Sequence, residues 1–274
     1  MVTSVNRNII VAQDSDDVFR NIHTTKGGNL AVAITDPQLG FHATVTPGGN
    51  LKTAEQTHLA GEAFGGSALL SSEWNVDLTG SGTQDATGAG ELSMDTGTTA
   101  NSAVDLDTVN VARFIPANYN TAHCAITIPD GASYAANNSR RWGAFNPTDA
   151  SCNGMFFEID AGSWYVCHCI NGTVTRIALA SWNGAGASSF PINSITANVY
   201  EIEYNAGSII YRVNGEVIHR ETLLASPFAN DIHFRVGLSN TNSSGSTTDV
   251  IMKVPAAAIY TLGRGRGVDR PTYI

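Results

Sequence analysis

Apolar and polar residues alternate in short runs through residues 140–240. The run 155–160 is apolar at its odd-numbered positions, whereas Glu158 and Asp160 take even-numbered positions. The run 200–204 repeats this order, with Glu201 and Glu203 between apolar or aromatic neighbours. A period of two residues is typical of strands that bury one face and expose the other. The pattern therefore predicts a series of half-buried β-strands.

Short turn sequences separate these runs: Ala161-Gly162, Asn171-Gly172, Asn205-Ala206-Gly207 and Asn214-Gly215. Asn-Gly between two strand-like runs favours a type I′ hairpin turn, because both residues tolerate a positive φ. We therefore expect at least two consecutive antiparallel hairpins, which together form a β-meander.

Further strand-like runs flank the meander, at 30–34, 68–78, 90–97, 109–119, 122–130 and 248–262. The run 51–64 is ambiguous, because its leucines are spaced as in a helix while Gly61 and its threonines favour an extended linker. Residues 80–90 are expected to form a flexible surface loop. The chain is thus predicted to hold an N-terminal arm or attachment segment (1–65), a β-sandwich (66–262) and a short basic tail (263–274).

Composition supports an all-β protein. The chain has 274 residues, 27 glycines and only 14% charged residues, a mixture that favours an antiparallel β-sandwich over a helical fold. The net charge of −9 argues against a nucleic-acid partner, because phosphate binding needs a clustered basic surface. No apolar stretch reaches the length of a membrane span, and the first residues lack the apolar run of a signal peptide. We therefore expect a chain that is made and folded in a cytoplasm.

The cysteines do not predict a metal site. Cys167 and Cys169 would share one face of a strand while His168 points to the other, and the C-x₂-C spacing of zinc ribbons is absent. Cys124 and Cys152 are isolated. We expect reduced cysteines that act as small core residues, with no metal and no cofactor.

Glu158 and Asp160 are the strongest catalytic candidates. Glu158-Ile159-Asp160 resembles the start of the Glu-x-Asp-x-x-Glu or Glu-x-Asp-x-Glu motif of retaining glycosidases of the laminarinase and lichenase type, which use two glutamates across the sugar ring. Gly162 and Ser163 stand where the second glutamate should be. Carboxylates on the solvent face of a strand are more often simply hydrated. The prediction is therefore that the chain is not an enzyme.

Other titratable residues carry weaker signals. Glu201 and Glu203 alternate in the same way and have the same alternative interpretation, as solvated carboxylates. His219 could act as a general base, but no nucleophile motif such as G-x-S-x-G accompanies it.

Two groups of residues are candidates for binding. Aromatic rings stack on sugars in carbohydrate-binding faces, and Trp164, Tyr165 and Trp182 are the candidates here, although most tryptophans of a sandwich belong to its core. The three arginines of the tail are candidates for contact with an acidic neighbouring subunit, with nucleic-acid binding as the alternative; they are Arg264, Arg266 and Arg270.

The central block resembles a domain of structural proteins of tailed bacteriophages. The similar pieces are RRWGAF (140–145), NG (153–154), FE (157–158), SWNG (181–184), YEIEY (200–204), VNG (213–215), IH (218–219), Arg235 and Asn240, preceded by GGNLAVAITDP (27–37) and TAEQT (53–57). The resemblance implies a concanavalin- or laminin-G-like jelly roll on the virion, without catalytic residues.

This resemblance implies a function as well as a fold. We expect a virion structural protein of the tail, baseplate or capsid surface, assembled as a homo-oligomer with other virion proteins and in contact with a host surface glycan. The alternative is a carbohydrate-binding module that recognises host glycans, and a glycoside hydrolase is the third hypothesis.

Overall fold

The computed structural model describes residues 11–13, 19–21, 43–45, 51–53, 56–86, 88, 90–114, 119–127, 135–149, 153–190, 197–205, 208–222, 232–244 and 249–262. The chain divides into two units, one of Thr57–Leu262 and one of Met1–Gln56 with Gly263–Ile274. In the second unit, β1 (Val11–Gln13) pairs with β2 (Phe19–Asn21) and β3 (Ala43–Val45) pairs with β4 (Leu51–Thr53).

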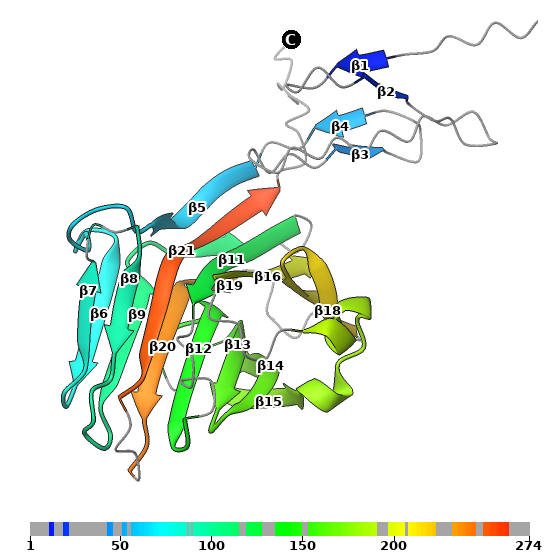
Figure 1. Cartoon of the computed structure of the whole chain (residues 1–274). Coiled ribbons are helices and arrows are strands. Elements are labelled where there is room, and N and C mark those ends of the chain that lie inside the picture. Colours follow the sequence, from blue (N-terminus) through cyan, green and yellow to red (C-terminus); the bar gives the residue numbers. More distant parts are fainter. Residues whose placement is uncertain are drawn as a thin grey trace, which may run out of the picture. The chain divides into compact units, whose positions relative to one another are not determined.

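Two antiparallel sheets build the larger unit (Figure 1). The eight-stranded sheet has the order β18-β17-β16-β11-β21-β8-β7, and β5 also pairs with β21. Its strands are β5 (Gln56–Ala63), β7 (Thr83–Ala86), β8 (Leu92–Asp95), β11 (Tyr119–Thr127), β16 (Asn198–Asn205), β17 (Ser208–Val213), β18 (Glu216–Thr222) and β21 (Ile251–Leu262).

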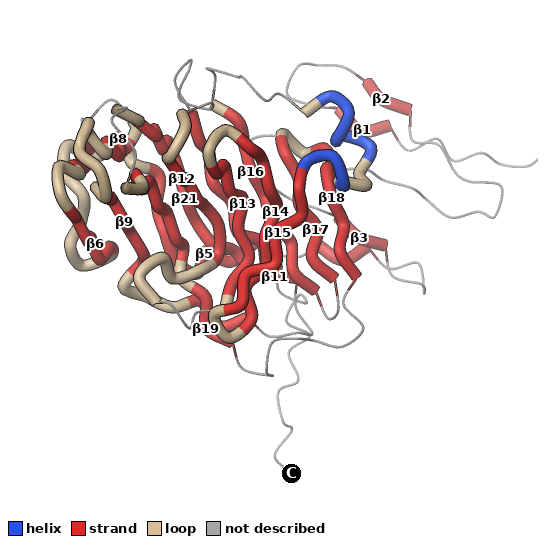
Figure 2. Tube along the Cα trace, turned by 90° about the horizontal axis from the view of Figure 1, so that it is seen from below, coloured by secondary structure: helices blue, strands red, loops and turns tan. Residues whose placement is uncertain are grey.

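The seven-stranded sheet has the order β15-β14-β13-β12-β20-β9-β6. Its strands are β6 (Trp74–Thr79), β9 (Ala103–Thr108), β12 (Asn138–Ala144), β13 (Gly154–Asp160), β14 (Ser163–Ile170), β15 (Thr173–Ala178) and β20 (Val236–Asn242). A small ladder joins β10 (Ala112–Phe114) to β19 (Ile232–Phe234). Within the described residues, the helical elements are two short 3₁₀ turns, η2 (Leu179–Ser181) and η3 (Ala185–Ser189), drawn blue in Figure 2.

The core lies between the inner faces of the two sheets. Trp142 of the seven-stranded sheet packs edge-on against Tyr200 of the eight-stranded sheet, with 4.9 Å between ring centroids. Phe157 and Trp164 flank this pair at 6.1 and 6.0 Å from Trp142. All four rings are buried in one continuous apolar cluster. The predicted antiparallel β-sandwich is therefore confirmed.

The hairpins of the meander form at the turn sequences that predict them. Asn171 and Gly172 have φ of 48° and 79° between β14 and β15, and Asn214 and Gly215 have φ of 51° and 81° between β17 and β18. Left-handed φ at both central residues is the conformation that a two-residue type I′ turn requires. The turn chemistry of the sequence is therefore sufficient to fix these hairpins.

Outside the meander, the structure settles one ambiguity and corrects two expectations. The ambiguous run 51–64 is strand, as β4 and β5, and because β5 pairs with β21 the sandwich begins at Thr57 rather than at residue 66. The predicted flexible loop 80–90 contains β7, whose backbone pairs with β8. The distant strand β21 supplies the backbone hydrogen bonds of β5, and the next strand along the chain, β8, supplies those of β7. The predicted strand 30–34 lies outside the described residues.

The segment that joins β15 to β16 packs against the edge of the eight-stranded sheet. The amide of Asn183 donates to the backbone oxygen of Arg220 (2.9 Å) and accepts from its backbone nitrogen (2.8 Å), as a neighbouring strand would. The backbone nitrogen of Gly184 donates to the oxygen of Ile218 at 2.9 Å. The segment therefore covers the free edge of β18, which would otherwise present unpaired backbone groups.

Replacement of Gly184 by alanine should destabilise the sandwich by about 1–3 kcal/mol, because the added Cβ would lie 2.1 Å from the carbonyl oxygen of Val217. Gly65→Ala is the matched control, since a Cβ there meets nothing within 4 Å. Denaturant unfolding of the full chain measures both variants. Equal stability of the two variants would contradict the close approach of this segment to β18.

Candidate functional site

The outer face of the seven-stranded sheet carries a row of polar side chains. Strand register places Asp77, Asp105, Ser239, Arg141, Glu158 and Tyr165 side by side on β6, β9, β20, β12, β13 and β14. We call these six residues the outer row. On β9, β20, β12, β13 and β14 these residues alternate with buried residues of the inner face, so burial of that face directs the row outward. On β6, the neighbours of Asp77 are themselves exposed. The row is the candidate site.

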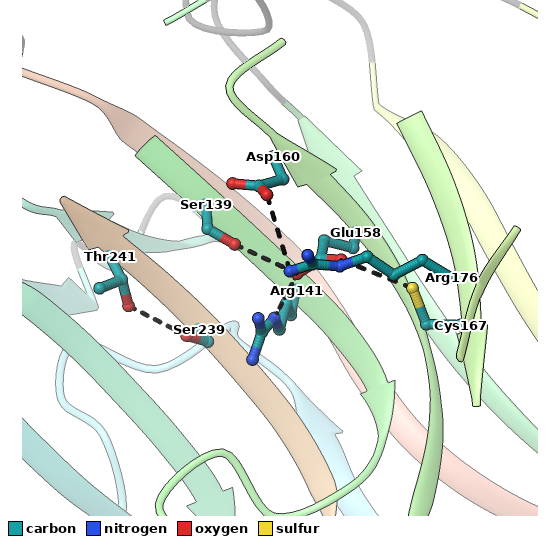
Figure 3. A network of polar contacts seen from close by, with 8 residues as sticks. All are labelled: Ser139, Arg141, Glu158, Asp160, Cys167, Arg176, Ser239 and Thr241. Atoms are coloured by element: carbon teal, nitrogen blue, oxygen red, sulfur yellow. Dashed lines mark hydrogen bonds and ion pairs between the residues drawn. The ribbon is translucent and has the colours of Figure 1, made fainter. Parts of the chain in front are cut away.

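Glu158 is the centre of the outer row (Figure 3). Its Oε1 accepts from Arg141 Nε at 2.6 Å and from Arg176 Nη2 at 2.9 Å. Its Oε2 accepts from Arg176 Nε at 2.5 Å. The side chain of Glu158 is fully buried, whereas those of Arg141 and Arg176 are 32% and 41% exposed. The two guanidinium groups therefore cover the carboxylate and neutralise it.

The electrostatics of Glu158 follow from this contact. Burial alone would raise the pKa of the carboxyl, but hydrogen bonds and charges from Arg176 and Arg141 outweigh it and hold the pKa of Glu158 below its ordinary value of 4.5. The same contact raises the pKa of Arg176. Glu158 is therefore ionised and paired at neutral pH. A proton-donating role needs a raised pKa, which is the opposite shift.

An apolar plug covers the part of the outer face next to Glu158. Phe145, which follows β12, packs on Phe156 with 4.8 Å between ring centroids, and Cys167 and Cys169 are buried in the same cluster. Cys167 Sγ lies 3.6 Å from Glu158 Oε2. Burial and the nearby Glu158 carboxylate raise the pKa of the Cys167 thiol well above its ordinary range, so it remains protonated.

Cys167 and Cys169 are free and buried, which agrees with the predicted role of small apolar residues. His168 points to the other side of the strand, where its Nδ1 lies 2.9 Å from Glu221. Among the described residues, no group of three or more His, Cys, Asp or Glu is placed to hold a metal ion.

A polar hollow lies at the β6 end of the outer face. It encloses about 350 Å³ and is lined by Asn75, Val76, Asp77, Asp107, Asn146, Thr148 and Arg235. Asp107 is held in place by Arg235 (3.1 Å) and by Asn75 (3.0 Å). Asn146 accepts from the backbone and hydroxyl of Thr148 at 3.0 and 2.9 Å, which shapes the rim of the hollow. The hollow thus presents fixed hydrogen-bonding groups to solvent.

Of the three aromatic candidates, only Tyr165 lies on this face. Trp164 is 4% exposed and packs edge-on against Phe190 at 4.8 Å, and Trp182 is 8% exposed and contacts the same ring at 5.0 Å. A ring must present a face to a sugar in order to stack on it, and these two indoles are core residues instead. Tyr165 is half-buried under Arg176, whose Cζ lies 5.8 Å from the ring centroid.

The remaining sequence candidates lie elsewhere. Glu203 is on β16 in an ion pair with Arg212 at 3.1 Å, and Glu201 lies on the same strand. His219 is buried 6.2 Å from the Tyr211 ring, and burial lowers its pKa. None of these three residues belongs to the outer row. The tail residues Arg264, Arg266 and Arg270 lie outside the described residues, so their predicted subunit contact stays a prediction.

Sequence reasoning missed the arginines of the site, although a usable signal for one of them is present. The two-residue turn at Asn171-Gly172 pairs Ile170 with Thr173, and the same register pairs Cys167 with Arg176. Only β14 then lies between the strand of Arg176 and the strand of Glu158. The partner Arg141 could not be found this way, because a long connection separates β12 from β13. The hollow was also missed, since β6, β9 and the segment after β12 are far apart in sequence.

Comparison with known proteins supports the fold. No family model matches the sequence, and no curated protein matches it. The endo-β-1,3-glucanase of Pyrococcus furiosus superposes with a TM-score of 0.56 at 12% identity, covering 81% of this chain and 99% of that one.

Two further solved structures have related descriptions. A pseudo β-1,3-glucanase and immunostimulatory antigen of Mycobacterium tuberculosis gives a TM-score of 0.52 at 10% identity over 74% of this chain and 98% of its own. The carbohydrate recognition domain of Emp47p gives 0.52 at 10% identity over 74% and 93%. At such identities the likeness shows the fold alone. The chain has the fold of a concanavalin-like jelly roll. Among its described residues, no helix is long and apolar enough to cross a membrane.

Replacement of Glu158 by glutamine should destabilise the protein by about 1–3 kcal/mol, because Arg141 and Arg176 lose their counter-charge. The pKa of Glu158 is lowered in the folded state. The carboxylate therefore stabilises the fold fully above its ordinary pKa, and this contribution is lost as the pH falls through the lowered value. Unfolding measured from neutral to acidic pH should show this loss in the wild type and not in Glu158→Gln.

The matched control for this variant is Glu91→Gln. Glu91 pairs with Lys253 at 2.5 Å, but both side chains are partly exposed. Loss of this ion pair should lower the free energy of unfolding by at most about 1 kcal/mol. If both variants behave alike, the outer row does not depend on Glu158.

Proposed function

We propose that this chain is a structural protein of a tailed-phage virion whose jelly roll binds glycans without hydrolysing them. The observation that carries the proposal is the state of Glu158. A retaining glycosidase needs one carboxylate free to attack the sugar and a second carboxyl group about 5–5.5 Å away. Here both oxygens of Glu158 are occupied by arginines. Gly162 of the following turn and Ser163, the first residue of β14, stand where the second glutamate would be.

The outer row supports binding of an extended ligand. It crosses six strands, which at about 4.8 Å between neighbours makes a face of roughly 24 Å. This is longer than one sugar ring. Hydrogen-bonding groups line it from the hollow at Asp107 to the half-exposed ring of Tyr165, a mixture of fixed polar groups and an aromatic ring that suits sugars. Ser239 and Arg141 lie between these ends.

Charge narrows the class of ligand. Asp77, Asp105 and Asp107 gather at the β6 end, and burial together with the charge of Asp77 raises the pKa of Asp105 despite a hydrogen bond from Ser239. An anionic sugar would meet like charge there. We therefore propose neutral glycans as ligands rather than uronic or sialic acids.

The first test combines binding and turnover. A glycan array followed by calorimetry on soluble neutral glucans should show saturable binding, with no release of reducing ends. Asp77→Ala and Tyr165→Ala, at the two ends of the row, should each weaken binding about tenfold or more. Tyr260→Ala is the control, because Tyr260 lies on β21 of the other sheet. Hydrolysis that disappears in Glu158→Gln would overturn the non-hydrolytic proposal, and absence of binding to every glycan would overturn the glycan-binding proposal.

The virion role rests on the resemblance of the central block. Several residues of that block have structural roles in the sandwich: Trp142 lies in the core, Asn183 and Gly184 cover the edge of β18, and Asn214-Gly215 forms a hairpin turn. They support the jelly-roll part of the resemblance most directly. We propose that the unit formed by Met1–Gln56 and Gly263–Ile274 mediates assembly with copies of this chain and other virion proteins.

Light scattering tests the assembly proposal. The full chain should be a discrete oligomer, and a truncated chain of Thr57–Leu262 should be a monomer with unchanged circular dichroism. The truncation point follows the division of the chain and keeps β5 on β21. A monomeric full chain that still binds glycans would favour an independent carbohydrate-binding module instead.

A further inference from the structure

Arg140 lies on the inner face of the seven-stranded sheet. Its neighbours Ser139 and Arg141 contact Glu158 on the outer face, so alternation along β12 turns Arg140 toward the core. In register it lies between Ile159 of β13 and Asn240 of β20, both buried. Arg140 is 0% exposed, and it is one of the largest fully buried side chains of the described residues.

The guanidinium group of Arg140 has no hydrogen-bond partner in the described part of the chain. Its Nε, Nη1 and Nη2 atoms are all buried and unpaired among the residues that the structure describes. The two buried carboxylates of the described chain, Asp107 and Glu158, are on the outer face and bind other arginines. Burial lowers the pKa of Arg140 to about 10, which leaves it charged at neutral pH. The core thus holds a positive charge without a described counter-charge.

The polar groups around Arg140 do not remove this imbalance. Asn138 Nδ2 donates to the side-chain oxygens of Asn240 and Asn242, each at 3.0 Å. Asn240 Nδ2 donates to the backbone oxygens of Met94 (2.9 Å) and Val250 (2.7 Å). These amides therefore form a well-paired buried network. The exception is Asn138 Oδ1, which has no partner in the described part of the chain.

Two more donors on the same inner face are also unpaired. The indole nitrogens of Trp142 and Trp164 are buried without a hydrogen-bond partner among the described residues. Trp142 is two residues from Arg140 on β12, and Trp164 is opposite Ile159, the neighbour of Arg140. Among the described residues, these five unpaired donor nitrogens of Arg140, Trp142 and Trp164 outnumber the two unpaired carbonyl acceptors, Asn138 Oδ1 and Gln84 Oε1. An isolated buried charge is costly, typically by several kcal/mol, unless a partner of opposite charge is present.

From this arrangement we infer that the interior of the jelly roll binds one monovalent inorganic anion of chloride size, held by the guanidinium group of Arg140. A halide accepts hydrogen bonds from any direction and carries one negative charge, so it would both accept from the guanidinium nitrogens and neutralise the cation. Water would satisfy only the hydrogen bonds. This anion site is separate from the glycan-binding outer row, because the two lie on opposite faces of the same sheet.

The direct test is a crystal structure of the full chain grown with sodium bromide. Anomalous scattering should show a bromide ion within hydrogen-bond distance of the Arg140 guanidinium. An ordered water or a protein carboxylate in that position would overturn the inference. This measurement uses the wild-type chain and therefore does not depend on whether any variant folds.

Thermal unfolding gives a second test at constant ionic strength. When chloride replaces the bulky anion isethionate, the Tm of the wild type should rise by roughly 3–5 °C for each tenfold increase above the dissociation constant. Arg140→Met replaces the guanidinium group by an unbranched apolar side chain without charge and should abolish this rise. Arg212→Met removes a partly exposed arginine on β17 and should retain it. Equal chloride dependence in Arg140→Met and the wild type would overturn the inference.

Discussion

The packing of aromatic rings between the two sheets is the constraint on which the rest of the structure depends. Trp142 meets Tyr200 across the interface, and Phe157 packs against both rings. Because side chains alternate along a strand, burial of Trp142 and Phe157 fixes the direction of every neighbour on β12 and β13. Arg141 and Glu158 must face outward, and Arg140 must face inward. The polar outer row and the buried cation are therefore two consequences of one register.

The sandwich shares its fold with solved glucanases, but the carboxylate at the centre of its outer face is held in ion pairs. Glu158 sits between two guanidinium groups, and the plug of Phe145 and Phe156 closes the face beside it. Such a pair is stable only while both partners remain, because removal of one leaves an uncompensated charge. The open parts of the face are consequently at its ends, near the hollow at Asp107 and near Tyr165. This division is the physical basis for proposing binding rather than turnover.

At the β18 edge of the eight-stranded sheet, residues of the resemblance also have a structural role. Asn183 pairs with the backbone of Arg220 through both ends of its amide, and Gly184 approaches β18 too closely for any side chain. Together they end a sheet that would otherwise continue through its free edge. A short sequence signature such as Trp182-Asn183-Gly184 is therefore explained by packing and hydrogen bonding inside one chain. This signature therefore indicates the fold of the chain and does not by itself indicate a location in a larger particle.

The sequence by itself determined the elements whose causes are local. Alternation predicts β13 and β16, and Asn-Gly turns predict the hairpins β14–β15 and β17–β18, because turn type sets the pairing of the next few residues. The pairing of β5 with the distant β21 could not be predicted, since the composition around β5 gives no sign of its partner, and the Gly- and Thr-rich composition around β7 hid its hairpin with β8.

Tertiary structure alone decided the chemistry. It placed Arg141 and Arg176 on the carboxylate of Glu158, moved Trp164 and Trp182 into the core, and left Arg140 without a partner among the described residues. The physical reason is that a strand's own sequence gives two faces but not their neighbours. Only the pairing of distant strands and the packing of one sheet on the other determine which groups meet on each face.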